Sequence, residues 1–153
     1  MFDYTMEHIC SYTATLESPP ELIGLVPEGV RLNAYVTGGE VTGDRIRGKV
    51  RPVGADWLTL RSDGVCNLDV RATIETHDGG LIYLAYQGVG DLGEDGQKNF
   101  LEGKVPEKFF IRTAPRLSSA HPDYMWVNRC QFVGIGEGDF INSSVAYDLY
   151  ALR

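Results

Sequence analysis

Two arginines on predicted strands could bind the anionic group that forms during proton transfer on a small molecule. Arg71 lies in "LDVRATIET", where Asp69 and Thr73 share its face of the strand. Arg112 lies in "FFIRTAP", between apolar neighbours on its own face. A guanidinium binds a carboxylate or an enolate oxygen through two parallel hydrogen bonds, and deprotonation cannot remove its charge. If both arginines point into one shared hollow, they form a clamp for an anionic group of a small molecule.

Carboxylates and a phenol are the groups that could move a proton beside this clamp. Asp69 or Asp56 is the candidate base, and Tyr83, on the next strand, is the candidate acid or hydrogen-bond donor. The predicted catalytic residues are therefore Asp56, Asp69, Arg71, Tyr83 and Arg112. The predicted substrate-binding residues are those that could stack on a flat molecule or hydrogen-bond to it: Trp57, Trp126, Asn128 and Thr73.

The same residues have structural interpretations that the sequence leaves open. A row such as Asp69, Arg71, Thr73 and Glu75 is most often a solvated strand face, with a weak surface ion pair in it. Arg112 could belong to an internal ion pair. Likewise, Trp126 could be a core residue, and Asn128 could satisfy backbone groups at a strand end.

The elements that would position these residues are almost all strands. Apolar and polar residues alternate with a period of two along most of the chain, whereas a period of 3.6 is nearly absent. Residues 68–88 read as a hairpin around an Asp-Gly-Gly turn, residues 88–106 as a long polar loop, and "MWVNRCQFVGIGEG" as a strand and a turn. About eight to ten short strands predict one all-β domain over residues 1–153, an antiparallel β-barrel of the up-and-down, calycin-like type.

Motifs for a cofactor or a metal are absent. "GVGDLG" fits G-x-G-x-x-G, but no helical pattern follows it, so it is interpreted as part of a loop. The three histidines, His8, His77 and His121, are scattered and have no metal-ligand spacing. We therefore expect neither a cofactor nor a metal ion.

Composition and charge limit the partners and the compartment. The chain has 14 Lys and Arg against 21 Asp and Glu, a net charge of -7, and no basic cluster, so a nucleic acid is not expected as a partner. The three cysteines have no C-x-x-C spacing, which suits a reducing compartment. Neither a signal peptide nor a membrane span is recognisable, and we expect a cytoplasmic protein.

At this level of detail the sequence resembles a known family. "GADW", "LDVRATIET", "LIY", "RTAP" and "YMWVN" together resemble the family numbered 3237 among the domains of unknown function, also called the UPF0311 proteins. The resemblance covers nearly the whole chain. It implies a small antiparallel β-barrel that associates with itself as a dimer or larger oligomer, and it implies no settled activity. The segment 88–106 is longer and richer in glycine than the family pattern, and could be a lid over a binding site.

Three functions fit these observations. The first is a cofactor-free enzyme that transfers protons on a small aromatic or carbonyl-bearing molecule, by isomerase, lyase or cyclase chemistry. The second is a barrel that binds a small molecule without converting it. The third is a structural, homo-oligomeric module in which the polar row faces solvent and side chains fill the barrel. The resemblance favours a lined cavity and therefore the first hypothesis.

Overall fold

Ten β-strands and two short helical segments make up the computed structural model, which describes all residues from Met1 to Arg153. The strands are β1 (Met6–Leu16), β2 (Glu21–Val26), β3 (Gly29–Thr42), β4 (Gly48–Leu60), β5 (Val65–Thr76), β6 (Leu81–Asp91), β7 (Lys108–Thr113), β8 (Arg116–Ser118), β9 (Gln131–Asp139) and β10 (Ser144–Leu152). The helical segments are α1 (Gly96–Leu101) and a 3-10 helix at Met125–Arg129. Neither segment has the length and apolar run of a helix that crosses a membrane.

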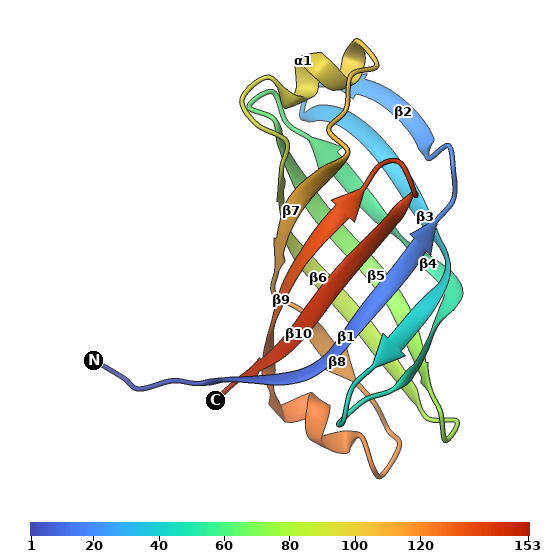
Figure 1. The fold of residues 1–153 in the computed structure, drawn as a ribbon, viewed down its shortest axis with the longest axis vertical. Coiled ribbons are helices and arrows are strands. Elements are labelled where there is room, and N and C mark those ends of the chain that lie inside the picture. Colours follow the sequence, from blue (N-terminus) through green and yellow to red (C-terminus); the bar gives the residue numbers. More distant parts are fainter.

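Eight of these strands form a closed barrel. Their order around it is β1-β10-β9-β7-β6-β5-β4-β3, and β1 pairs with β3 as well as with β10, which closes the circle (Figure 1). β2 extends the sheet outward from β3, and the short β8 pairs with β6. Every pairing is antiparallel, so the predicted antiparallel β-barrel is confirmed.

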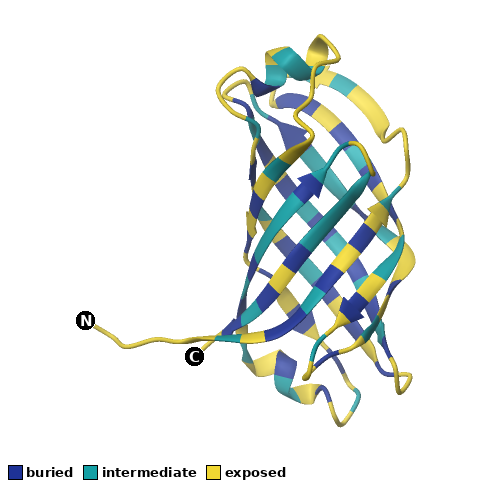
Figure 2. Ribbon diagram, in the orientation of Figure 1, coloured by how far each residue is buried: buried dark blue, intermediate teal, exposed yellow.

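Alternation along each strand separates the interior from the outer surface. On β5, Leu68, Val70, Ala72 and Ile74 are buried, whereas the residues between them are partly exposed. The same alternation marks the other barrel strands (Figure 2). Because successive side chains of a strand point to opposite faces, the buried residues of each strand line the barrel interior.

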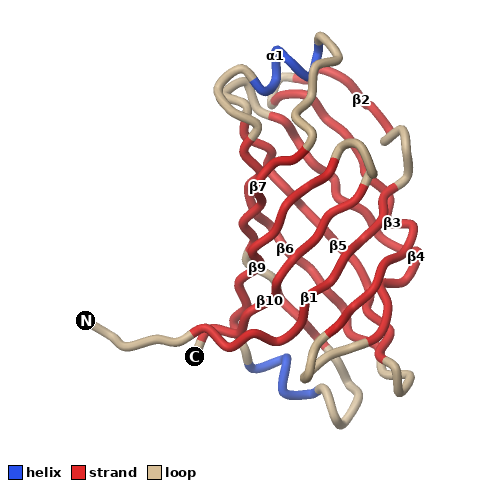
Figure 3. The backbone as a smooth tube through the Cα atoms, viewed as in Figure 1, coloured by secondary structure: helices blue, strands red, loops and turns tan.

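The two ends of the barrel differ. The 3-10 helix and the β5–β6 turn lie at one end, and α1 and β2 lie at the other (Figure 3). At the 3-10 end, Tyr124, Val127 and Phe132 are buried in the main core cluster. The ring centroid of Trp126 lies 6.3 Å from that of Phe132. The 3-10 end is therefore packed with side chains.

The predicted loop over residues 88–106 is only partly a loop. β6 continues to Asp91, because Gly88 to Asp91 pair with residues Thr113 to Phe110 of β7. α1 follows at Gly96–Leu101. The pairing satisfies backbone N–H and C=O groups that a loop would leave to water.

The prediction of a strand and a turn for "MWVNRCQFVGIGEG" is also wrong in part. Its first residues form the 3-10 helix, and the glycines lie within β9. Gly136 and Gly138 leave room for aromatic rings: a Cβ at Gly136 would lie 2.4 Å from Tyr147 Cδ1, and one at Gly138 would lie 2.3 Å from Phe109 Cε1. These glycines therefore serve packing inside the barrel.

Candidate active site

A cavity of about 520 Å³ occupies the barrel interior towards the end that carries α1 and β2. Most of its lining side chains are apolar, among them Leu32, Leu58, Leu68 and Leu84. Ligand sites in proteins have this size and this mostly apolar lining, with a few polar groups that orient the ligand. The barrel interior thus has the dimensions of a small-molecule site.

The segment between β6 and β7 contributes to the wall of this cavity. Phe100 of α1 and Val105 beyond it line the cavity together with Pro20 of the β1–β2 connection and Phe140 of the β9–β10 turn. These residues come from connections at one end of the barrel (Figure 1). Part of the segment predicted as a lid, including Phe100 and Val105, therefore lies at the end of the barrel where the cavity is found.

Asp56 places a carboxyl group among the apolar side chains of the cavity wall. It lies on β4 and is half-buried. Its Oδ1 accepts a hydrogen bond of 3.0 Å from the backbone N–H of Asp69, and no protein group donates to Oδ2. Burial raises the pKa of this carboxyl to about 7, with a further contribution from the charge of Asp69, although the hydrogen bond from the Asp69 amide opposes the rise.

The local sheet structure fixes the position of the Asp56 carboxyl. A register shift between Val50 and Gly54 marks a bulge in β4. Beyond it, Asp56 pairs with Val70 and Thr59 pairs with Asn67, but the two pairs between them are missing from the ladder. At this gap the carboxyl of Asp56 accepts the hydrogen bond from the Asp69 amide, so the strand itself fixes the carboxyl's position.

The charged residues of the cavity lining are all acidic. They are Glu17, Asp56 and Asp139, and no Lys or Arg lines the cavity. An anionic ligand would therefore be repelled from the site, whereas a neutral one would not. No cation stabilises the ionised form of Asp56, so the hydrogen bond from the Asp69 amide is left to do so alone.

Three buried tyrosines form a cluster of phenol rings inside the barrel. Tyr12 of β1, Tyr86 of β6 and Tyr147 of β10 all line it. The rings of Tyr12 and Tyr147 are stacked at 5.0 Å, and Tyr86 meets Tyr147 edge-on at 5.7 Å. Burial raises the pKa of each phenol well above its usual value, so all three remain hydrogen-bond donors at neutral pH.

The expectation that Arg71 and Arg112 point into a shared hollow is wrong. Arg71 lies between the inward-facing Val70 and Ala72, so its side chain points outward, where its Nη1 lies 2.5 Å from Asp69 Oδ1. Arg112 is exposed, donates to the backbone oxygens of Ile111 and Gly136, and lies over the ring of Phe110. The cause is parity, because apolar residues occupy the inward positions on both strands.

Arg112 instead lines a hollow on the outer wall of β1, β3, β7, β9 and β10. An exposed arginine adds little to stability. We expect Arg112→Ala to change the free energy of unfolding by less than about 1 kcal/mol, which corresponds to one exposed cation–π contact. Urea unfolding followed by tryptophan fluorescence measures this, and a loss twice as large would contradict the outward placement.

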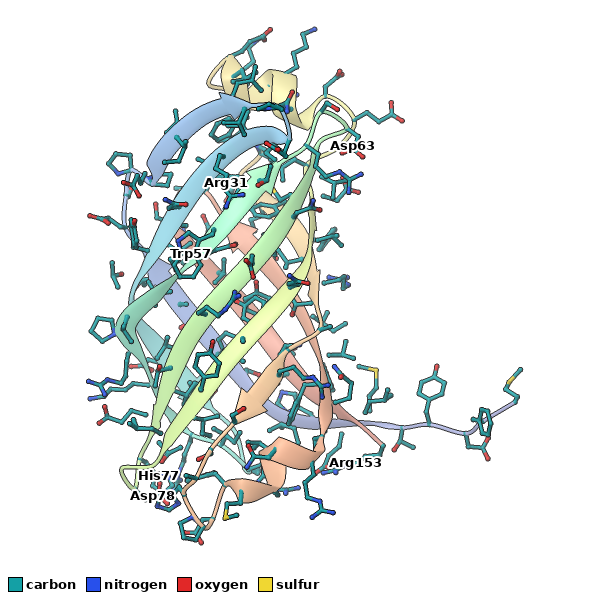
Figure 4. The ribbon with its side chains drawn as sticks, turned by 180° about the vertical axis from the view of Figure 1, so that it is seen from behind. Arg31, Trp57, Asp63, His77, Asp78 and Arg153 are labelled. Atoms are coloured by element: carbon teal, nitrogen blue, oxygen red, sulfur yellow. The ribbon has the colours of Figure 1, made fainter.

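Three further predicted residues lie on the outer face with Arg71. Asp69 and Thr73 follow the same parity on β5, and Tyr83, which pairs with Thr73 across β5 and β6, is 48% exposed. Trp57 has the opposite parity to Asp56 and lies on the β3–β4 wall (Figure 4). Of the predicted catalytic residues, the structure thus brings only Asp56 to the cavity.

Trp126 and Asn128 lie near the packed end of the barrel. The guanidinium of Arg45 lies 4.2 Å from the centre of the Trp126 ring. Asn128 donates to the backbone oxygens of Ser119 and Met125 and accepts from the Ser119 amide, as expected of a residue that satisfies backbone groups. Neither residue lines the cavity.

Sequence reasoning missed the three tyrosines, although the signal was present. In "LIYLAYQG", Tyr86 shares the parity of Ile82 and Leu84, whereas Tyr83 has the other parity. A phenol on the apolar parity of a strand is a polar group carried into the interior. The same reasoning applies to Tyr12, which shares parity with Cys10 and Ala14.

One group of side chains outside the cavity has the composition of a metal site. Asp78, His121 and Asp123 each offer a ligand atom, and these atoms lie within 4.8 Å of one another near the packed end. Figure 4 shows Asp78 at the tip of the β5–β6 turn. Hydrogen bonds from Thr76 and Tyr124 lower the Asp78 pKa to about 2. Sequence spacing could not reveal this group, because the fold brings Asp78 to the other two.

Known proteins match both the sequence and the fold. A UPF0311 protein of Rhodopseudomonas palustris is 34% identical over 113 residues, which cover 72% of this chain and 74% of that protein. A solved structure from Acinetobacter baumannii, described as a beta-barrel like protein, is 28% identical with a TM-score of 0.84, and the alignment covers 100% of this chain and 98% of that one. An enzyme from Penicillium herquei shares the fold at 17% identity and a TM-score of 0.72, with 100% and 97% of the chains covered.

The family model described as "Protein of unknown function (DUF3237)" matches residues 4–152. Together with the UPF0311 relative, this match confirms the resemblance noted in the sequence. The chain therefore belongs to the DUF3237 family.

Proposed function

We propose that this protein is an enzyme that transfers protons on a small, neutral, carbonyl-bearing ring compound held inside the barrel. The observation that carries the proposal is Asp56, a carboxyl in an apolar cavity with one oxygen free of protein partners and no cation beside it. A general base works best when its pKa lies near the working pH, and the Asp56 pKa of about 7 meets this condition.

The roles of the surrounding residues follow from their positions. Asp56 takes a proton from a carbon next to the carbonyl and returns it to the same or another carbon, which is isomerase-type chemistry. The leucines of the wall exclude water and hold the ring by apolar contact. A distant relative in fold is described as an enzyme, which is consistent with catalysis on this scaffold.

The direct test is hydrogen exchange. Ring ketones such as β-tetralone are incubated with the protein in deuterated buffer, and loss of the α-proton signals is followed by NMR. We expect exchange above the buffer rate for ketones that fit the cavity. Binding without exchange would favour the barrel that binds without conversion, and neither binding nor exchange by any ring ketone would overturn the proposal.

Blocking the cavity provides a prediction with a matched control. Ala72 is buried and lines the cavity, whereas Thr73, the next residue, points outward. We expect Ala72→Phe to weaken β-tetralone binding at least about tenfold, because the ring would occupy ligand space, and Thr73→Phe to change it less than about twofold. Isothermal titration calorimetry measures both, and equal effects would place the ligand elsewhere.

A further inference from the structure

The second oxygen of the Asp56 carboxyl is a polar atom of the cavity that a ligand can reach. Oδ1 accepts the Asp69 amide, whereas no protein group donates to Oδ2. Two side-chain polar atoms are both fully buried and without a partner, the Tyr12 hydroxyl and Thr113 Oγ1. Asp56 Oδ2 also lacks a partner but is not one of them, so it keeps accessible surface. Because Asp56 lines the cavity, this surface is open to a ligand.

Small residues leave room beside this oxygen. Ala34 of β3 pairs with Asp56 across the sheet. Ala72 of β5 pairs with Gly54, which lies two residues before Asp56 on β4. Both alanines line the cavity, and glycine has no side chain to project into it. A ligand group of the size of an ammonium can therefore approach the carboxyl without displacing the cavity wall.

The charges of the cavity favour a cation at this position. Glu17 lies in the β1–β2 connection and Asp139 at the end of β9, both towards the end that carries α1 and β2 (Figure 1), and no Lys or Arg lines the cavity. Hydrogen bonds from Asn142 lower the pKa of Asp139, which is therefore charged at neutral pH. Negative charges along an apolar cleft attract cations. Deeper inside, Asp56 is the carboxyl that can pair with a cation, and an unpaired charge is costly there.

We propose that the cavity binds apolar ring compounds that carry a protonated amine, with the ammonium paired to Asp56 and the rings against the leucines of the wall. This inference rests on the proposed function only for the location of the site, and it requires no catalysis. Folding has already removed the carboxyl from bulk water, so binding of the amine does not repeat that desolvation cost. A bound amine occupies the place of the ketone and inhibits its proton transfer.

Binding of the amine releases a proton wherever Asp56 is protonated in the empty cavity. Because the Asp56 pKa is about 7, at pH 6 the carboxyl must give its proton to solvent before it can pair with the ammonium. An alkyl ammonium keeps its own proton up to about pH 10. We therefore expect the affinity to rise about tenfold for each pH unit below pH 7 and to level off above it.

The other groups around Asp56 do not account for such a pH dependence. β3 presents only apolar side chains to the cavity. Burial raises the pKa of Cys66 on β5 to about 12, and it raises the pKa of the three phenols well above their usual value. Asp69 lies on the outer face of β5, and Glu17 and Asp139 lie towards the end of the barrel. A midpoint near pH 7 would therefore report Asp56.

The test compares three ligands of one shape. Binding of 2-aminotetralin, β-tetralone and tetralin is measured by calorimetry for wild type, Asp56→Asn and the control Asp69→Asn, which removes a carboxylate from the outer face. At pH 8 we expect Asp56→Asn to weaken 2-aminotetralin binding at least about tenfold and tetralin binding less than about twofold. Asp69→Asn should change neither by more than about twofold. At pH 6, the dependence of the enthalpy on the buffer should show release of about one proton for each amine bound to wild type and none for Asp56→Asn.

The outcomes separate this inference from the proposed function. An amine that binds wild type no tighter than tetralin at pH 8, that binds Asp56→Asn equally well, or that at saturation leaves the exchange of β-tetralone unchanged, would overturn the amine site and leave the ketone reaction standing. Amine binding that depends on Asp56, without any α-proton exchange from β-tetralone, would support the amine site and overturn the enzyme. Failure of all three ligands to bind would overturn both.

Discussion

Asp56→Asn is expected to stabilise the protein at pH 8 and to abolish proton transfer. The folded protein holds this carboxyl at a pKa of about 7, against 3.8 for the free group, because burial disfavours the charge. At 1.36 kcal/mol for each pKa unit, the difference amounts to about 4 kcal/mol. Since the side chain borders an open cavity, we expect a gain of about 1–3 kcal/mol in the free energy of unfolding.

The sign of the pH dependence follows from the raised pKa. Between pH 4 and 7 the folded state binds a proton at Asp56 that the unfolded state has released, so this group makes stability fall as pH rises. Below pH 4 both states are protonated, and above pH 7 the penalty is complete. Urea unfolding of wild type and Asp56→Asn from pH 4 to 8 should therefore give curves that diverge as pH rises.

A second carboxyl, that of Asp78, provides a control because its pKa is shifted in the opposite direction. Hydrogen bonds from Thr76 and Tyr124 lower the pKa of Asp78 to about 2, so ionised Asp78 adds stability that is present above about pH 4 and lost towards pH 2. Asp78→Asn should destabilise the protein at neutral pH, whereas Asp56→Asn should stabilise it. A loss of stability in both variants would mean that the Asp56 carboxyl is held ionised by its surroundings.

The loss of proton transfer in Asp56→Asn is measured by the rate of hydrogen exchange and its pH dependence. Asn cannot accept a proton from carbon, so the exchange rate of β-tetralone should fall by at least about two orders of magnitude. In wild type the rate should rise with pH and reach half its maximum near pH 7, where Asp56 ionises. Exchange that survives in Asp56→Asn with an unchanged pH profile would assign the base to another group.

The sequence predicts the barrel well because alternation is a local property of each strand. One face of the β5 strand is apolar throughout and must lie against a core. The structure buries all four of its residues: Leu68, Val70, Ala72 and Ile74. The wrong step was to place the polar face of β5, which carries Arg71, towards a cavity. The cavity inside this barrel is lined mostly by apolar side chains. Its polar groups come from single polar residues, such as Asp56 and Tyr86, on strand faces that are otherwise apolar.

Asp56 and Trp126 show where parity itself stops being informative. Asp56 follows a register shift between Val50 and Gly54 that gives β4 two more residues than β5, and one extra residue would have reversed its face whereas two preserve it, a difference that the sequence does not show. Trp126 and Asn128 alternate over too few residues to distinguish a strand from the 3-10 helix that forms. Both cases depend on backbone geometry that neighbouring strands impose.

Gly54→Ala is expected to cause the largest loss of stability among these variants. Gly54 has a φ of 98°, and a Cβ there would lie 2.0 Å from the backbone oxygen of Arg71 on β5. The strained φ and the contact with backbone atoms act together, because β4 and β5 cannot separate without losing ladder hydrogen bonds. We expect the free energy of unfolding to fall by about 2–4 kcal/mol, measured by urea unfolding at pH 7.

Gly79→Ala separates the two causes of that loss. Gly79, in the β5–β6 turn, has a φ of 86°, and a Cβ there would meet nothing within 4 Å, so only the backbone strain applies. Its loss should be about 1 kcal/mol. Gly54 lies two residues before Asp56 on β4, and a displaced β4 would move the carboxyl, so Gly54→Ala should shift the midpoint of the exchange–pH profile, whereas Gly79→Ala should leave it near pH 7. Equal losses in the two variants, with unshifted midpoints, would show that β4 accommodates a side chain at residue 54 and that the bulge does not position the carboxyl.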